Sequence, residues 1–418
     1  MTRLPGRWIP PQGLVFGQLA HGASWIVLLV LALHGLTGIG LPALGYVHLV
    51  ALGWLTMTAL SILIHVIPAF TDVVWHWESL ARRSLAVYAI GVLVLVAGFC
   101  TGAPRALPWG GTIVALGLLG YAIPAAITLA SAFRRGRVEA AIARALGATL
   151  TFFLLAAGLG VAFTWALGGR LSSLVLAVGV PIHAEFGLIG WLTVLAMGVS
   201  ARTVRPMTGG GSPSSWKHVT AGFAQVLGML LVGAGSIVGS PSLLWTGIIV
   251  LGIGVAVYVI DLADVLRRAT VRHRVPQAFL ASAAFWLVAA FVLGAGIFRG
   301  LPWGPTFVYV ALIGWLGGMV NAHLHHIGVR LLATAFRGDD DETRADELLS
   351  QALSWTTFVL FEVALIVGVA SLLAGLSGLL ESAAIAGGAG WSAMAANTIY
   401  AARRASGPPT VLSLLRTR

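Results

Sequence analysis

The sequence has very little charge. Only 9% of its 418 residues are Asp, Glu, Lys or Arg, whereas a soluble globular protein has about 25%. Hydrophobic residues make up 58% of the chain, and its mean hydropathy is +0.94. This composition excludes a water-soluble enzyme, a disordered protein and a nucleic-acid binder.

Cysteine is almost absent as well. The single residue, Cys100, excludes a disulfide framework, a cysteine metal site and the Cys-x-x-Cys-His attachment of a c-type haem. Histidine, by contrast, occurs 11 times beside only 14 carboxylates. Histidine is therefore unusually frequent for so apolar a chain, and its imidazole is the candidate functional group.

The apolar runs are long and continuous, and each is close to the roughly 20 residues that a membrane-spanning helix needs. They predict an all-α integral membrane protein that forms one domain over 1–418, with no separate soluble domain. We expect twelve transmembrane helices at 15–38, 44–69, 85–103, 110–132, 146–167, 173–203, 219–238, 242–263, 277–298, 306–333, 353–374 and 379–401.

The basic residues predict how these helices are oriented. With the N-terminus inside, 22 of the 25 Lys and Arg residues fall on one side of the membrane, and only Arg105, Arg170 and Arg299 fall on the other. The positive-inside rule therefore favours a multi-pass protein of the inner (cytoplasmic) membrane with both termini cytoplasmic. The net charge of +11 is explained by topology, so no nucleic-acid partner is expected.

One short pattern occurs three times along the chain. The sequences LVALGWLT, FGLIGWLT and VALIGWLG contain Trp54, Trp191 and Trp315, and they fall in the second, sixth and tenth predicted helices. Such self-similarity is typical of internal repeats. We therefore expect three pseudo-repeats of four helices, at approximately 1–135, 140–268 and 276–404, about a pseudo-threefold axis.

Most of the histidines lie within the predicted spans, where an ionisable residue is costly and is by default a functional candidate. His76, His218 and His273 are assigned to inside loops, where solvation at the membrane surface explains them. Any single intramembrane histidine could also serve as a hydrogen-bonding residue between helices. Six of the eight lie on the three repeat-equivalent helices: His48, His65, His183, His323, His325 and His326.

Buried imidazole without cysteine is suited to haem ligation, copper ligation or proton transfer. One or two b-type haems held between helices fit the apolar bundle best, and Arg202, Arg205 or Arg330 could pair with the haem propionates. Copper is also possible. His65, Arg202 and His326 occupy equivalent positions, each eleven residues after its tryptophan.

With twelve predicted helices in three repeats and histidines concentrated on equivalent helices, the sequence resembles the catalytic subunit of haem-copper oxidases and nitric oxide reductases, including their smaller NnrS-type relatives. The segment Ala322-His323-Leu324-His325-His326 is similar to the helix-10 motif of that superfamily, and His183-Ala184-Glu185-Phe186 is similar to its helix-6 motif. The resemblance implies that His323 binds a high-spin haem and His325 a low-spin haem. It also implies that His183 binds copper and that His48 is the second ligand of the low-spin haem. The seventh predicted helix lacks the His-His pair of that superfamily, so a full three-histidine copper site is not expected.

Three functions are compatible with this pattern. The first is a haem-bearing redox protein that handles oxygen or nitric oxide. It would receive electrons from a quinol or a cytochrome, bind a small diatomic ligand and use Glu362 and Glu185 as proton-relay carboxylates. The second is a proton-coupled transporter of a small ion. The third is a non-catalytic haem or metal sensor, or an assembly factor.

Overall fold

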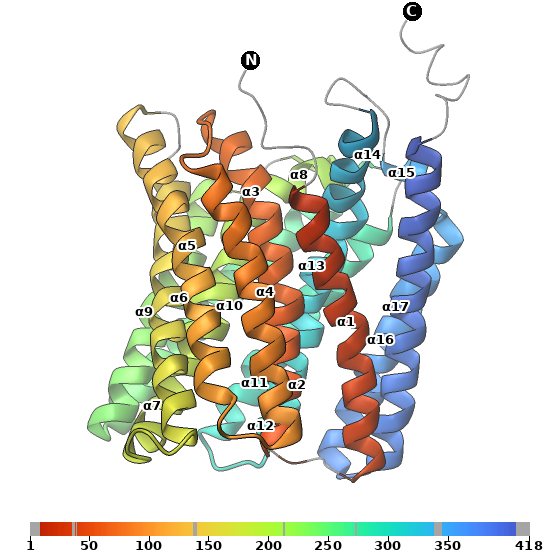
Figure 1. The fold of residues 1–418 in the computed structure, drawn as a ribbon. Helices are drawn as coiled ribbons and strands as arrows, with labels where there is room; N and C mark the ends of the chain where they lie inside the picture. The colour runs from red at the N-terminus through yellow and green to blue at the C-terminus, as the bar shows by residue number, and fades with distance from the viewer. Residues whose placement is uncertain are drawn as a thin grey trace, which may run out of the picture.

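The computed structural model is a bundle of long helices that run roughly parallel to one another (Figure 1). It describes residues 9–35, 38, 40–136, 140–211, 214–271, 274–337 and 345–406. Within these ranges the regular structure is helical throughout and contains no β-strand. The all-α class that the sequence predicts is therefore confirmed for the part of the chain that is described.

Three of the predicted spans consist of several helical segments in series, and the others are single helices. The elements are α1 Ile9–Leu33, α2 Leu41–His48, η1 Leu49–Thr56, α3 Met57–Thr71, α4 Glu78–Thr101, α5 Leu107–Arg134, α6 Ala140–Leu167, α7 Leu174–Glu185, η2 Phe186–Thr193, α8 Val194–Thr208, α9 Ser215–Val238, α10 Pro241–Arg267, α11 Val275–Ile297, α12 Gly304–Tyr309, η3 Val310–Gly317, α13 Gly318–His323, η4 Leu324–Gly328, α14 Val329–Arg337, α15 Ala345–Leu348, α16 Gln351–Ala374 and α17 Ser377–Ser406.

Eleven helices in the described ranges are long and apolar enough to cross a membrane, and they coincide with the first eleven predicted spans. The twelfth prediction, 379–401, coincides with α17, whose 30 residues are long enough to span a bilayer. This helix is rich in alanine and glycine and is less apolar than the others. The chain is thus a multi-pass membrane protein, with α17 as the least apolar of its long helices.

The ends of the described chain lie together. Helix α1 begins and α17 ends at the same end of the bundle, which is the upper end in Figure 1. Helix α17 packs against both α16 and α1, so the last helix contacts the first. The pairs α4–α5 and α9–α10 also pack along their lengths.

Two of the composite helices form the centre of the bundle. In the most apolar stretches of Leu41–Thr71 and Gly304–Phe336, 78% and 83% of the residues are buried, compared with at most 50% in the other nine spans. A helix that is apolar on all sides is expected to be surrounded by protein in this way. These two helices carry five of the six histidines on the repeat-equivalent helices, so those imidazoles lie along the most buried part of the fold.

Each of the three Gly-Trp segments is π-helical. Elements η1, η2 and η3 span eight residues each and coincide with LVALGWLT, FGLIGWLT and VALIGWLG. The π-helix is rare in proteins, and the examples that occur often lie at functional sites. The indole of Trp191 donates to Thr56 Oγ1 at 3.0 Å, and the indole of Trp315 donates to Thr193 Oγ1 at 3.2 Å. These two hydrogen bonds connect η2 to η1 and η3 to η2.

Candidate functional site

His48 and His183 lie side by side although 135 residues separate them in the sequence. His48 is the last residue of α2, and His183 lies two residues before the end of α7. Their ring centroids are 6.3 Å apart, with an angle of 23° between the ring planes. His48 also stacks on Phe99 at 5.0 Å, and Phe163 packs edge-on against His183 at 5.4 Å. Aromatic rings therefore enclose the pair on two sides.

Both imidazoles are held by the same kind of hydrogen bond. The Nδ1 atom of His48 lies 2.8 Å from the carbonyl oxygen of Leu44, and that of His183 lies 2.8 Å from the carbonyl oxygen of Ala156. A carbonyl can only accept, so each Nδ1 carries the proton and donates it. Each Nε2 then keeps its lone pair. This is the tautomer in which a histidine binds a metal, oriented by a backbone partner.

The spacing of the pair suits one metal ion. Two imidazoles that bind one ion from opposite sides, each at about 2.0 Å, would place their ring centroids about 6 Å apart, and the observed 6.3 Å is compatible with that arrangement. Both donors are neutral nitrogens, a set that suits iron in haem as well as copper. Within the described ranges, no group of three or more His, Cys, Asp or Glu side chains is placed to hold a metal ion.

The histidines of the tenth span have other partners. The Nδ1 atom of His323 lies 2.7 Å from the Met319 carbonyl, and its Nε2 lies 2.7 Å from the hydroxyl of Thr203, so both ring nitrogens are engaged. His325 is buried, bonds through Nδ1 to the Asn321 carbonyl at 2.8 Å and packs against Phe279 on α11. His326 follows in η4, where its side chain is half-buried.

The remaining candidate residues are spread along the bundle. His65 is half-buried on α3, whereas the side chains of Arg202 on α8 and Arg330 on α14 are exposed. Glu362 on α16 accepts hydrogen bonds from Ser282 at 2.5 Å and from the indole of Trp286 at 3.1 Å, both on α11.

Glu185 lies two residues after His183, at the end of α7. Its Oε2 atom is buried and has no hydrogen-bond partner among the described residues, and it lies beside Gly233 of α9. Glu362, by contrast, accepts hydrogen bonds from α11 and so connects α16 to α11. Glu185 has no such bridge in the described chain.

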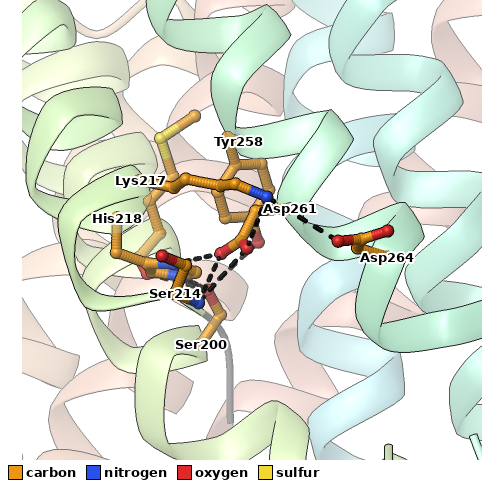
Figure 2. Close-up of polar contacts among 8 residues, drawn as sticks. Ser200, Ser214, Lys217, His218, Tyr258, Asp261 and Asp264 are labelled. Carbon is orange, nitrogen blue, oxygen red and sulfur yellow. Dashed lines mark hydrogen bonds and ion pairs between the residues drawn. The ribbon is translucent and has the colours of Figure 1, made fainter. Parts of the chain in front are cut away.

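A second polar site lies where α8, α9 and α10 meet (Figure 2). Asp261 on α10 is only 1% exposed, and its carboxylate contacts His218 Nδ1 at 2.9 Å. The other ring nitrogen, His218 Nε2, lies 3.3 Å from the hydroxyl of Ser200, which also accepts a hydrogen bond from Tyr258 at 3.1 Å. The backbone N–H of Ser214 donates to both carboxylate oxygens at 3.2 Å.

This second site has a charged outer edge. Lys217 Nζ lies 3.6 Å from Asp261 and 3.7 Å from Asp264, whose side chain is 50% exposed. The polar groups thus form a hydrogen-bonded series from Asp261 through His218 and Ser200 to Tyr258, whose ring packs against Trp315. Such a series of exchangeable hydrogens can transfer a proton between an exposed ion pair and the centre of the bundle.

The sequence analysis missed this site. It assigned His218 to a solvated loop, whereas the structure places His218 in the first turn of α9, with a side chain only 9% exposed. His76, also assigned to a loop, is half-buried, and His273 lies outside the described residues. Asp261 could have indicated this site, because it is an ionisable residue within the predicted span 242–263.

Neither protein-family models nor the curated proteins include a match to this chain. The functional conclusion is therefore drawn from the geometry of the two sites.

Proposed function

We propose that the protein is a haem-binding membrane protein of the haem-copper oxidase-like type, with a redox role in handling oxygen or nitric oxide. The observation that carries this proposal is the His48–His183 pair, with its ring separation of 6.3 Å and its two Nδ1–carbonyl hydrogen bonds. The proposed ligand pair differs from the one that the resemblance implies. It joins His48 to His183 rather than to His325, which bonds to Asn321 and packs on Phe279.

The residues around the pair would orient a b-type haem. Phe99 and Phe163 enclose the two imidazoles, and the carbonyls of Leu44 and Ala156 fix their tautomers. When bound, a bis-imidazole haem supplies one-electron transfer. The protein keeps both donor nitrogens neutral and rigid before any ligand arrives. A quinol or a cytochrome is the proposed electron donor.

We further propose the three-unit arrangement and the inner-membrane orientation. The three eight-residue π-helices support equivalence of the second, sixth and tenth spans, because each begins immediately after the corresponding residue His48, Glu185 or Tyr309. The bias of 22 of the 25 basic residues to one side supports cytoplasmic termini.

The haem proposal is tested by changing one ligand at a time. The protein is expressed in haem-replete cells, purified, and assayed for haem by the pyridine haemochrome spectrum. We expect His48→Ala and His183→Ala each to lose most of the haem or to change its spectrum from low-spin to high-spin. The matched control is His34→Ala, because His34 makes the same type of Nδ1–carbonyl bond, to Val30, but is exposed. Full low-spin haem in both ligand variants would refute the assignment.

One observation favours a second candidate, a proton-coupled transporter of a small ion. The series from Asp261 to Tyr258 is buried and hydrogen-bonded throughout, and membrane-embedded ionisable residues often carry protons in transporters. In liposomes without electron donors, a transporter would move protons when its ion is supplied, and Asp261→Asn would stop that movement. Proton movement by protein that contains no haem would favour the transporter over the haem protein.

A further inference from the structure

A group of polar side chains in the middle of the bundle has no hydrogen-bond partner. His21 on α1, Trp54 on η1, Thr58 on α3 and Asn321 on α13 are each at most 2% exposed. Among the residues that the structure describes, both nitrogens of His21, the indole N–H of Trp54, the hydroxyl of Thr58 and both amide atoms of Asn321 are unpaired. We call these four residues the His21 cluster.

The four side chains come together because the helices approach closely. The ring of His21 stacks on that of Trp54 at 3.6 Å, with 3° between the planes. A Cβ atom at Gly17, one turn before His21, would lie 2.6 Å from Thr58 Oγ1. A Cβ atom at Gly317 would lie 2.8 Å from the Trp54 ring. Asn321 follows Gly317 by one helical turn and Thr58 follows Trp54 by one turn, so each lies one turn beyond a residue of the Trp54–Gly317 contact.

Several other polar groups in the same helices are satisfied locally, although Gln18 and Trp25 on α1 are also unpaired among the described residues. Ser61 and Thr71 on α3 donate to carbonyls one turn earlier, those of Met57 and Ile67, and the histidines of the tenth span bond to Met319 and Asn321. Thr58 lacks this common bond although it lies in the same helix. The two other Gly-Trp tryptophans donate to Thr56 and Thr193, whereas the indole N–H of Trp54 has no partner among the described residues. The Trp54 atoms that face Gly317 are the ring carbons Cη2 and Cζ3.

Unpaired polar groups at this depth require a partner. Neither lipid nor an apolar core supplies one, and buried groups of this kind are usually satisfied by internal water that makes about three hydrogen bonds. The cluster has a single imidazole and no carboxylate or thiolate, which does not suit a metal ion.

We infer that the His21 cluster binds ordered water, with at least one molecule hydrogen-bonded to His21 and to a second member of the cluster. The water connects α1 to the central helices of the bundle. The site is independent of the proposed haem ligands, because none of its four residues belongs to the His48–His183 pair.

The direct test is an experimental structure of the wild-type protein in detergent or nanodiscs, at a resolution that shows water. We expect density within about 2.7–3.2 Å of a His21 ring nitrogen. An empty cluster, a larger ligand, or new bonds among the side chains themselves would each overturn the inference.

A stability comparison gives a second readout. His21→Phe keeps the ring stacking but removes both nitrogens, and Asn321→Leu removes the amide. If water is bound, both changes should lower the apparent Tm by a few degrees, more than Ser61→Ala, which removes a bond within α3 alone. If the cluster is dry, replacing an unpaired polar group by an apolar one is neutral or stabilising. An unchanged or raised Tm in both variants would contradict the inference.

Discussion

At the scale of single residues, the surroundings of each ionisable group decide what it can do. His48 and His183 use the same nitrogen for a carbonyl and keep the other as a donor, whereas His323 has both nitrogens engaged. The sequence analysis named all three as ligands, since the pattern shows depth along a helix but not which neighbour faces a side chain. Asp261 shows the same limit, because its partner His218 is 43 residues away.

Asp261 should stabilise the protein much more than its neighbour Asp264. Both carboxylates contact Lys217, but the side chain of Asp261 is 2% exposed and that of Asp264 is 50% exposed. Replacing one partner of a buried pair leaves the other uncompensated, so Asp261→Asn is expected to cost about 3 kcal/mol. Asp264→Asn should cost less than about 1 kcal/mol. Thermal unfolding in detergent measures both, and equal losses would contradict the buried pair.

Glu362 should act as a hydrogen-bond acceptor between α16 and α11. Glu362→Leu leaves Ser282 and Trp286 without their acceptor and is expected to lower the free energy of unfolding by about 1–3 kcal/mol. Glu362→Gln keeps an acceptor oxygen and should lose less. The comparison is made by thermal unfolding of the two variants. If the leucine variant were as stable as the glutamine variant, the bridge would contribute nothing.

At the scale of elements, the three π-helical Gly-Trp segments distinguish this bundle from a set of regular helices. The Gly-Trp pattern marked these positions in the sequence, but it gave no sign of π-helical geometry, because that geometry depends on hydrogen bonds shifted by one residue. Nor does the sequence indicate which of these segments form hydrogen bonds with one another. Trp315 and Thr193 are 122 residues apart, and only the packing of η3 against η2 brings them together.

The indole–hydroxyl bonds should hold these segments together. Thr193→Val removes the acceptor of the buried Trp315 indole and is expected to cost about 1 kcal/mol. Thr151→Val is the matched control, since Thr151 is exposed and bonds only within its own helix, to Gly147. Chemical or thermal unfolding should show a larger loss for Thr193→Val. A loss no greater than that of the control would show that the bond does not stabilise the fold.

At the scale of the whole molecule, apolar composition was the most informative feature of the sequence, and the orientation that the basic residues predict stays a prediction. Hydropathy located eleven of the spans, since a lipid environment requires long apolar helices whatever their partners. It was least informative for α17, where alanine and glycine replace larger apolar residues. Such small residues allow helices to approach closely, as α17 does against α16 and α1.

The orientation can be tested with single cysteines. In a Cys100→Ser background, Arg105→Cys should react with a membrane-impermeant maleimide added to intact spheroplasts, whereas Arg268→Cys should react only after the membrane is opened. Both positions are exposed in the structure, so access depends on the side of the membrane. The reverse labelling pattern would place the termini outside.

The central claim is that this protein binds haem, and the reduced-minus-oxidised absorption spectrum of the purified wild-type protein tests it most directly. Protein from haem-replete cells should show a Soret band and the sharp α-band of a low-spin b-type haem, as expected for ligation by His48 and His183. A colourless, folded protein without a Soret band would contradict the claim.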